Sequence, residues 1–158
     1  YNRPERSVTD LAVVPKQFFV PEIIEGRKPL APTAKRAGWI GCNILLNRIP
    51  DAGKIVIVRN GVLEAREVVL EKWRQICFVR EQSTAARGWL LEVMKCVEDI
   101  CQNEFELADV DRFEPRLQSL YPGNQHVREK MRQQLQALRD GGFIEFLGRG
   151  KYRLRLRG

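Results

Sequence analysis

The sequence predicts an α+β fold whose C-terminal half is a winged-helix (helix-turn-helix) domain. Three observations lead to this prediction. Strand-type segments and tight turns fill the first part of the chain, apolar residues at helical spacing follow, and a basic hairpin closes the sequence. We therefore expect a domain boundary near Ser83, between residues 1–82 and residues 83–158.

The first half alternates strand and loop signals. Residues 11–20 are rich in β-formers, and residues 53–58 (GKIVIV) predict a buried strand followed by an Asn-Gly turn. Residues 21–43 contain three prolines and three glycines, which favours a structured loop over a helix. Residues 65–77 predict a helix, because apolar side chains recur along one face.

The second half opens with a helix for which Ser83 or Thr84 is the expected cap. Trp89 belongs to the apolar stripe of this helix, so we expect it in the core. A short strand-like piece follows at residues 104–107. Pro115 then begins a second short helix, because the residue before a proline avoids α geometry and proline suits a first helical turn.

The helix predicted for residues 124–140 is the most informative segment. Asn124 is its expected cap, and a Gly-Gly pair ends it. Four apolar residues form its buried stripe: Val127, Met131, Leu135 and Leu138. The candidate DNA-contacting residues at its start, on its opposite face and beside the stripe are Asn124, Gln125, His126, Arg128, Glu129, Arg132, Gln133 and Gln136.

Residues 143–147 and 151–157 predict a hairpin around the turn Gly148-Arg149-Gly150. Leucine alternates with arginine along its last strand, which indicates one apolar face and one basic face. Cations and backbone amides of such a wing suit phosphate contacts. The expected contacts are Arg149, Lys151 and Arg153, followed by Arg155 and Arg157.

The positive charge is concentrated at the C-terminal end. The net charge is +7, and residues 120–158 hold nine Lys and Arg against three Asp and Glu, whereas the rest holds 18 against 17. A concentrated excess indicates a polyanionic partner. A solvated surface that only aids solubility would explain a dispersed excess better.

The predicted elements follow one another in the order of a winged helix: helix, short strand, helix, capped helix and basic hairpin. A winged helix is a variant of the helix-turn-helix, and the second helix of that motif lies in the major groove of DNA. Arg, Gln and Glu are side chains that read base edges there. We therefore predict double-stranded DNA as the partner. A winged helix used only for protein contacts is the alternative.

Other classes are disfavoured. No apolar run is long enough to span a membrane, and no secretory signal is present. The cysteines lack Cys-x-x-Cys spacing and lie far from His126, so no zinc site is expected within this chain. We expect a cytoplasmic monomer whose thiols are buried and reduced, and, since the sequence begins at Tyr1, part of a longer protein. The cysteines are Cys42, Cys77, Cys96 and Cys101.

Several long strings resemble one family. They are VVPKQFF (13–19), RKPLAPTAKRAGWIGCNI (27–44), the Arg87-Gly88-Trp89 triplet, REKMRQQLQALRD (128–140) and IEFLGRGKYR (144–153). Together they resemble the Dam-replacing, DpnI-type family of methyl-directed restriction endonucleases. The resemblance extends from about Leu11 to Arg153, nearly the whole chain.

The resemblance implies cleavage of GATC when its adenines are methylated, by a PD-(D/E)xK nuclease domain joined to a winged helix. Residues 1–82 would then be the C-terminal part of the nuclease domain. The family's Mg²⁺ ligands and its structural Zn²⁺ cysteines would precede this sequence, so we expect this chain to bind DNA without cutting it. Asp51 and Glu64 superficially follow the nuclease pattern, but Arg66 stands where the pattern has lysine.

The segment around Trp39 suggests a second contact with DNA. Adenine methylation places an apolar group in the major groove, where proteins read methyls by apolar contact. Lys35 and Arg36 lie close to Trp39 in sequence and would bind phosphates. The resemblance favours this role over that of a core tryptophan, which composition alone would favour.

Two function classes remain open from the sequence. The first is the DNA-binding part of a methyl-directed restriction endonuclease. The second is a non-catalytic winged-helix regulator. The coding sequence upstream of Tyr1 would separate them, because only the nuclease requires metal-binding carboxylates and zinc cysteines there.

Overall fold

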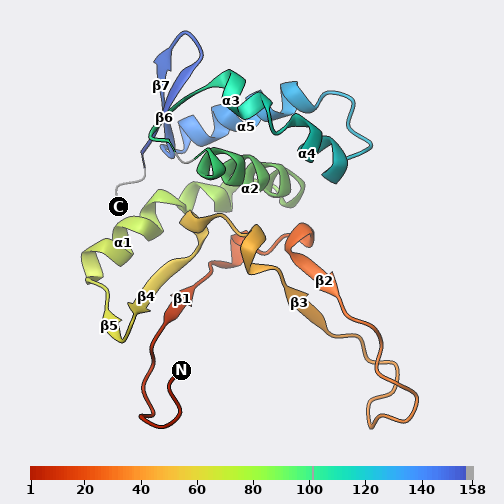
Figure 1. Ribbon diagram of the computed structural model, residues 1–158. Helices are drawn as coiled ribbons and strands as arrows, with labels where there is room; N and C mark the ends of the chain where they lie inside the picture. Colours follow the sequence, from red (N-terminus) through yellow and green to blue (C-terminus); the bar gives the residue numbers. More distant parts are fainter. Residues whose placement is uncertain (101, 156–158) are drawn as a thin grey trace.

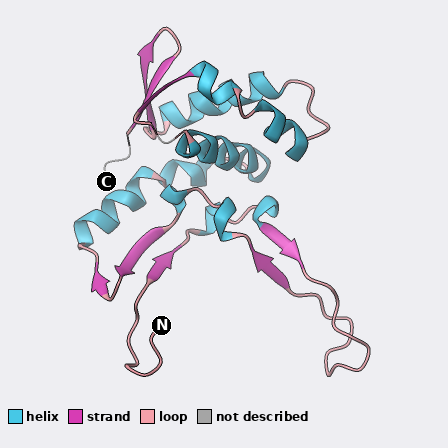
Figure 2. Cartoon of the chain, in the orientation of Figure 1, coloured by secondary structure: helices cyan, strands magenta, loops and turns pink. Residues whose placement is uncertain are grey.

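The computed structural model describes residues 1–100 and 102–155. Helices form a central layer, the C-terminal hairpin stands at one end of the molecule, and two separate β projections extend from the other end (Figure 1, Figure 2). One projection carries the N-terminal sheet. The other is a long hairpin that we call the arm, comprising residues 24–44.

The N-terminal sheet contains β1 (Leu11–Val13), β4 (Ile55–Arg59) and β5 (Val62–Leu63), all antiparallel, in the order β1-β4-β5. The predicted Asn-Gly turn is confirmed, because Asn60 and Gly61 have φ values of 51° and 78°. Helix α1 (Arg66–Gln75) follows within the predicted range and contacts β4.

The arm corrects the prediction of a loop for residues 21–43. Strands β2 (Ile24–Gly26) and β3 (Cys42–Ile44) pair antiparallel and form its root. The prolines and glycines lie mostly in the intervening turns, where they do not interrupt the pairing. Likewise, only the first three residues of the β-rich segment 11–20 form a strand.

Short 3₁₀ turns connect the strands and helices of the first half. Among the described residues these turns are η1 (Lys16–Phe18), η2 (Pro21–Ile23), η3 (Leu46–Arg48), η4 (Asp51–Gly53) and η5 (Cys77–Glu81).

The C-terminal half has the predicted winged-helix order. Ser83 caps its first helix, since its hydroxyl accepts a hydrogen bond from the Ala86 amide at 3.3 Å. Strands from both ends of the domain form one sheet, in the order β6-β8-β7. The elements of this C-terminal half are α2 (Thr84–Asp99), β6 (Glu104–Glu106), α3 (Leu107–Asp111), α4 (Glu114–Leu120), α5 (Val127–Asp140), β7 (Ile144–Gly148) and β8 (Lys151–Leu154). The prediction of β8 continuing to residue 157 extends into residues 156–158, outside the described part.

The hydrophobic core is centred on α2. This helix contacts α5 on one side and the η1 turn on the other, so buried residues from both halves form one continuous cluster. Trp89 is buried, as predicted, and so is the whole apolar stripe of α5. The division near Ser83 remains a prediction from the sequence.

Glu98 at the end of α2 also joins the two halves. Its carboxylate accepts hydrogen bonds from the backbone amides of Asp51 at 2.7 Å and Ala52 at 2.9 Å. These amides begin the η4 turn, which has no side-chain cap of its own. Burial raises the pKa of Glu98, and the two amide donors oppose that rise. The carboxylate therefore fixes the N-terminal sheet region to the central helix.

An apolar groove lies between α1 and the N-terminal sheet. It continues the apolar face predicted for α1, but Trp73 remains 42% exposed there. The groove is lined by Val13, Ile55, Ile57, Val69, Leu70 and Trp73. Among the described residues, no helix combines the length and apolar character needed to cross a membrane.

The thiols do not share one environment. Cys96 is buried, and burial raises its pKa to about 12. Cys77 is partly buried, but Cys42 is exposed on the arm, so the expectation of buried cysteines is wrong for Cys42. Cys101 lies outside the described residues.

The pairing of Arg116 with Glu92 predicts a stability effect. Glu92 on α2 is 5% exposed, and its carboxylate is 3.0 Å from Arg116 Nη2. We expect Arg116→Ala to lower the free energy of unfolding by about 3 kcal/mol, because the buried carboxylate loses its partner. Arg112→Ala removes an exposed pair with Asp109 and should cost less than about 1 kcal/mol. Urea unfolding of both variants measures the difference; equal losses would contradict the prediction.

Candidate nucleic-acid interface

Helix α5 presents the predicted polar face to solvent. Its apolar stripe packs against α2, which orients the opposite side outward. The exposed residues are Gln125, His126, Arg128, Glu129, Arg132, Gln133 and Gln136. Sequence reasoning missed Gln134, which is buried on the same helix.

Asn124 does not cap α5, which corrects the prediction. The helix begins at Val127, and His126 occupies the cap position without a side-chain cap bond. Instead, Asn124 Oδ1 accepts a hydrogen bond from the His126 amide at 2.8 Å, which closes a tight turn before the helix. Asn124 thus shapes the entry into α5.

Two arginines of α5 have acidic neighbours. Arg128 Nε donates to Glu114 at 2.7 Å, and this hydrogen bond raises the pKa of Arg128 above its usual range. Arg132 Nη2 lies 4.0 Å from Asp111, at the limit of an ion pair. In both pairs the arginine is half-exposed and its acidic partner is partly buried. Arg132 is the less constrained of the two, because its pair is the longer one.

The C-terminal end of α5 faces the first half of the molecule. Gln133 and Gln136 line a groove shared with Phe78 and Glu81 of η5, and Asp140 lies in the same groove. Acidic side chains there disfavour a phosphate backbone. The N-terminal part of α5 therefore forms the more suitable surface for DNA.

The wing turn exposes Arg149. This residue has a φ of 51° between Gly148 and Gly150, whose φ values are 95° and 76°. Positive φ at three successive residues folds the chain tightly, and the two glycines adopt it without steric cost. Among the described residues, Arg149 has no ion-pair partner.

The other wing cations that the structure describes are paired, so the predicted basic face is a mixed one. Arg153 donates through Nε and Nη2 to Glu104 at 3.0 and 2.7 Å, and Lys151 lies 3.3 Å from Glu106. Hydrogen bonding to Glu104 raises the pKa of Arg153. Both glutamates belong to β6, which pairs with β8 in the sheet. DNA phosphates would have to replace these carboxylates.

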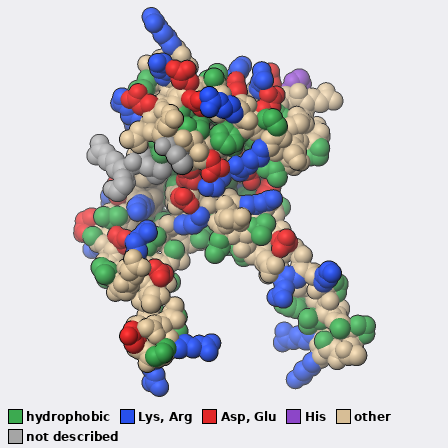
Figure 3. Space-filling model, in the orientation of Figure 1, with side chains coloured by type: hydrophobic (Ala, Val, Ile, Leu, Met, Phe, Trp, Pro, Cys, Tyr) green, Lys and Arg blue, Asp and Glu red, His purple; other side chains and the backbone are tan. Residues whose placement is uncertain are grey.

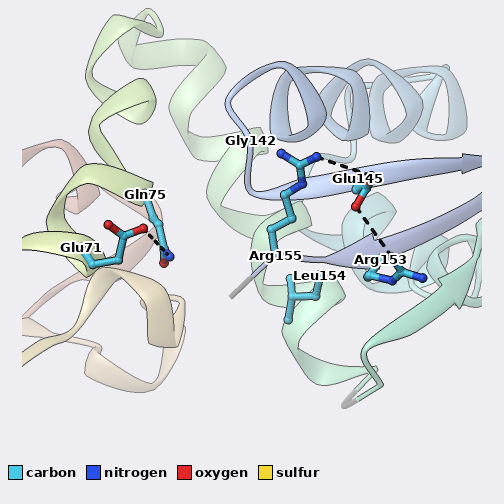
Figure 4. A pocket seen from close by; sticks show the side chains of 7 residues that line it. All are labelled: Glu71, Gln75, Gly142, Glu145, Arg153, Leu154 and Arg155. Atoms are coloured by element: carbon cyan, nitrogen blue, oxygen red, sulfur yellow. Dashed lines mark hydrogen bonds and ion pairs between the residues drawn. The ribbon is translucent and has the colours of Figure 1, made fainter. Parts of the chain in front are cut away.

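Between α1 and the wing sheet lies a pocket of about 610 Å³ (Figure 4). Glu145 bridges Arg153 and Arg155 there, at 3.9 and 3.5 Å. Glu71 and Gln75 of α1 line the opposite wall. The last predicted wing cation, Arg157, lies outside the described residues.

The arm exposes Trp39. The indole is 54% exposed, so the alternative of a core tryptophan is wrong. The ring lies against the backbone of Gly41, where an added Cβ would be 3.0 Å from it. The hairpin continues beyond its paired root, because the Leu30 amide donates to the Trp39 carbonyl at 3.0 Å.

Cations gather on the arm. Lys35 and Arg36 are exposed near its tip, and the structure adds Arg27 and Lys28, which sequence reasoning missed. No Asp or Glu occurs between Glu25 and Asp51, a sequence signal that identifies the whole segment as basic. Lys and Arg side chains accordingly line the arm in Figure 3.

The candidate residues therefore form two surfaces. The first comprises α5 and the wing turn, and the second comprises the arm around Trp39. Figure 1 places the wing and the arm tip at opposite ends of the molecule.

The described residues do not fit a metal ion. No group of three or more His, Cys, Asp or Glu side chains among them is arranged to hold one. Asp51 is paired with Lys54 Nζ at 2.7 Å, and that hydrogen bond lowers the pKa of Asp51. Glu64 lies 3.7 Å from Arg59.

Comparison with known families agrees with this architecture. A family model described as the Dam-replacing family (DpnI) matches residues 1–82. A second, described as the Dam-replacing HTH domain (DpnI_C), matches residues 85–154, which include α2 except its first residue, α5 and the wing. The chain belongs to the Dam-replacing, DpnI-type family, and its winged helix is the DNA-binding helix-turn-helix domain of that family.

Proposed function

We propose that this chain is the recognition part of a restriction endonuclease that acts on adenine-methylated GATC sites. The observation that carries the proposal is the exposed Trp39 on a basic arm, in a chain that also holds a DNA-binding helix-turn-helix domain. An exposed indole beside cations suits an apolar methyl group next to phosphates.

The winged helix supplies the first contact. The N-terminal part of α5 and the turn before it enter the major groove, where Arg132 and Gln125 reach base edges and Arg149 on the wing contacts phosphate. The paired cations of β8 strengthen this contact only after exchanging their carboxylate partners for phosphates. The protein acts as a monomer on double-stranded DNA.

The arm supplies the second contact. Lys35 and Arg36 bind phosphates, while the Trp39 ring covers the methyl group of the modified adenine. Burying a methyl contributes roughly 0.8 kcal/mol, so two methyls, one covered by the arm and one contacted by the winged helix, give about tenfold preference. The opposite positions of arm and wing mean that each surface meets its own stretch of duplex.

The family's Mg²⁺ and structural Zn²⁺ are held by residues outside this sequence. Mg²⁺ would supply the activated water for phosphodiester hydrolysis when bound there. This chain contributes binding and orientation of the DNA. A second candidate is a non-catalytic winged-helix regulator, because the helix-turn-helix domain alone is also compatible with that function.

The wing assignment predicts a change in salt dependence. Arg149→Ala should reduce the slope of log affinity against log salt by about 0.9, because one phosphate contact is lost. Lys151→Ala should reduce it less, since Lys151 already pairs with Glu106. DNA-binding titrations at several salt concentrations measure the slopes. Arg74→Ala on α1 is the matched control, and an unchanged slope in Arg149→Ala would sink the wing assignment.

The arm assignment predicts a loss of methyl preference. The chain should bind methylated GATC duplex about tenfold more tightly than unmodified duplex, from the area argument above. Trp39→Ala should reduce that ratio more than it weakens binding to unmodified DNA. Trp73→Phe, in the apolar groove beside α1, is the control and should keep the ratio. Equal affinities of the unaltered chain for methylated, hemimethylated and unmodified duplexes would refute methyl reading by this chain.

The assignment of the metal ions predicts binding without cleavage. Incubated with Mg²⁺ and methylated GATC plasmid, the chain alone should retard the plasmid on a gel and leave it uncut. No group of His, Cys, Asp and Glu side chains among the described residues is arranged to hold the ion, and Asp51 is paired with Lys54. Metal-dependent cutting that disappears in Asp51→Ala would show that the catalytic carboxylates lie within this chain.

A further inference from the structure

The Arg87-Gly88-Trp89 triplet of α2 belongs to neither DNA-facing surface, yet the root of the arm contacts the winged helix there. Glu22 lies in η2, directly before β2, and its carboxylate rests on Gly88. A Cβ at Gly88 would be 2.6 Å from Glu22 Oε1. Only glycine leaves room for the carboxylate at this position.

Tyr121 meets the same carboxylate from the other side. Its hydroxyl donates to Glu22 Oε1 at 3.1 Å, and its ring stacks on Trp89 with centroids 4.1 Å apart. Burial, and then the charge of Glu22, raises the pKa of Tyr121, so the hydroxyl remains a donor. Tyr121 ends α4 and opens the segment that leads into α5. The contact therefore reaches the segment that precedes the recognition helix.

Both strands of the arm are tied to this contact. Arg48, in the turn after β3, donates through Nη1 to the Glu22 carbonyl at 2.8 Å. The Leu45 amide donates to the Ile23 carbonyl at 2.8 Å. A displacement of either strand root is thus carried to Glu22.

One carboxylate oxygen at the contact is unsatisfied. Glu22 Oε2 is buried and has no hydrogen-bond partner among the described residues, and the same holds for Nε of Arg87, the residue before Gly88. Such atoms cost free energy in this arrangement of the contact.

We propose that Glu22 and Tyr121, seated on the Arg87-Gly88-Trp89 triplet, are positioning residues that couple the arm to the recognition helix. DNA contact at one surface then changes affinity at the other. This inference rests on the proposed function, because it requires that both surfaces bind DNA.

A mutant cycle on DNA affinity tests the coupling. Trp39→Ala alters the arm, Arg132→Ala alters the helix, and the double variant alters both; each is titrated with a long duplex carrying several methylated GATC sites. We expect the loss of affinity in the double variant to be smaller than the product of the losses in the two single variants, by about fivefold or more. If the two surfaces were uncoupled, the loss of affinity in the double variant would equal that product.

Two backgrounds remove the contact in independent ways. Tyr121→Phe removes the hydroxyl that donates to Glu22 and keeps the ring stacked on Trp89. Gly88→Ala displaces the Glu22 carboxylate, and alanine has a higher helix propensity than glycine, so α2 itself is not weakened. In both backgrounds, the loss of affinity in the double variant should equal the product of the losses in Trp39→Ala and Arg132→Ala. Tyr1→Phe is the control, because it removes an exposed tyrosine hydroxyl away from the contact. In that background the loss in the double variant should still be smaller than the product. Thermal unfolding shows whether each background variant is folded. One folded background is enough to decide whether the coupling passes through Glu22 and Tyr121.

The outcomes separate the two hypotheses. If Trp39→Ala or Arg132→Ala alone leaves affinity unchanged, the proposed two-surface function fails, and the coupling fails with it. If both single variants weaken binding but their losses multiply in the unaltered chain, only the coupling is refuted. If the shortfall persists in Tyr121→Phe and Gly88→Ala, the coupling does not pass through Glu22 and Tyr121.

Discussion

Burial of α2 from two sides is the constraint on which the rest of the structure depends. Leu90, Val93 and Met94 are fully buried on this helix, and each such side chain contributes roughly 1.5–3 kcal/mol. The α5 stripe covers one side, and the η1 turn with Phe18 covers the other. The recognition helix and the root of the arm are consequently placed by the same helix, although they serve opposite ends of the molecule.

The sequence was sufficient where one local pattern determines an element. Helical spacing of apolar residues predicted α2 and α5, and the Gly-Arg-Gly turn predicted the wing. It was insufficient where distant segments pair. The arm strands are separated by prolines and glycines that suggest a loop, and Arg153 meets Glu104 across 49 positions. The start of α5 was misplaced because Asn124 bonds to His126, two residues on, and so closes a turn instead of capping the helix.

For the candidate site, too, the sequence predicted what a local pattern determines and did not predict contacts between distant segments. Exposure of the α5 face followed from its periodicity, and the resemblance favoured an exposed Trp39 that composition alone would have buried. The ion pairs of the wing did not follow from any local pattern, because their acidic partners come from β6. These partners restrain the cations of β8 in the free protein. They thereby reduce attraction to DNA of arbitrary sequence, since each phosphate contact must first displace a carboxylate.

The shape of the arm has a consequence for handling the protein. Its outer part buries no large apolar side chain and is held by few backbone hydrogen bonds, so it opens at low free energy while the α2 core stays closed. Lys35 and Arg36 then become accessible to trypsin before any residue of the core does. A single early nick in the arm, with both fragments still held together by the core, is the expected pattern of limited digestion, and bound DNA should slow it.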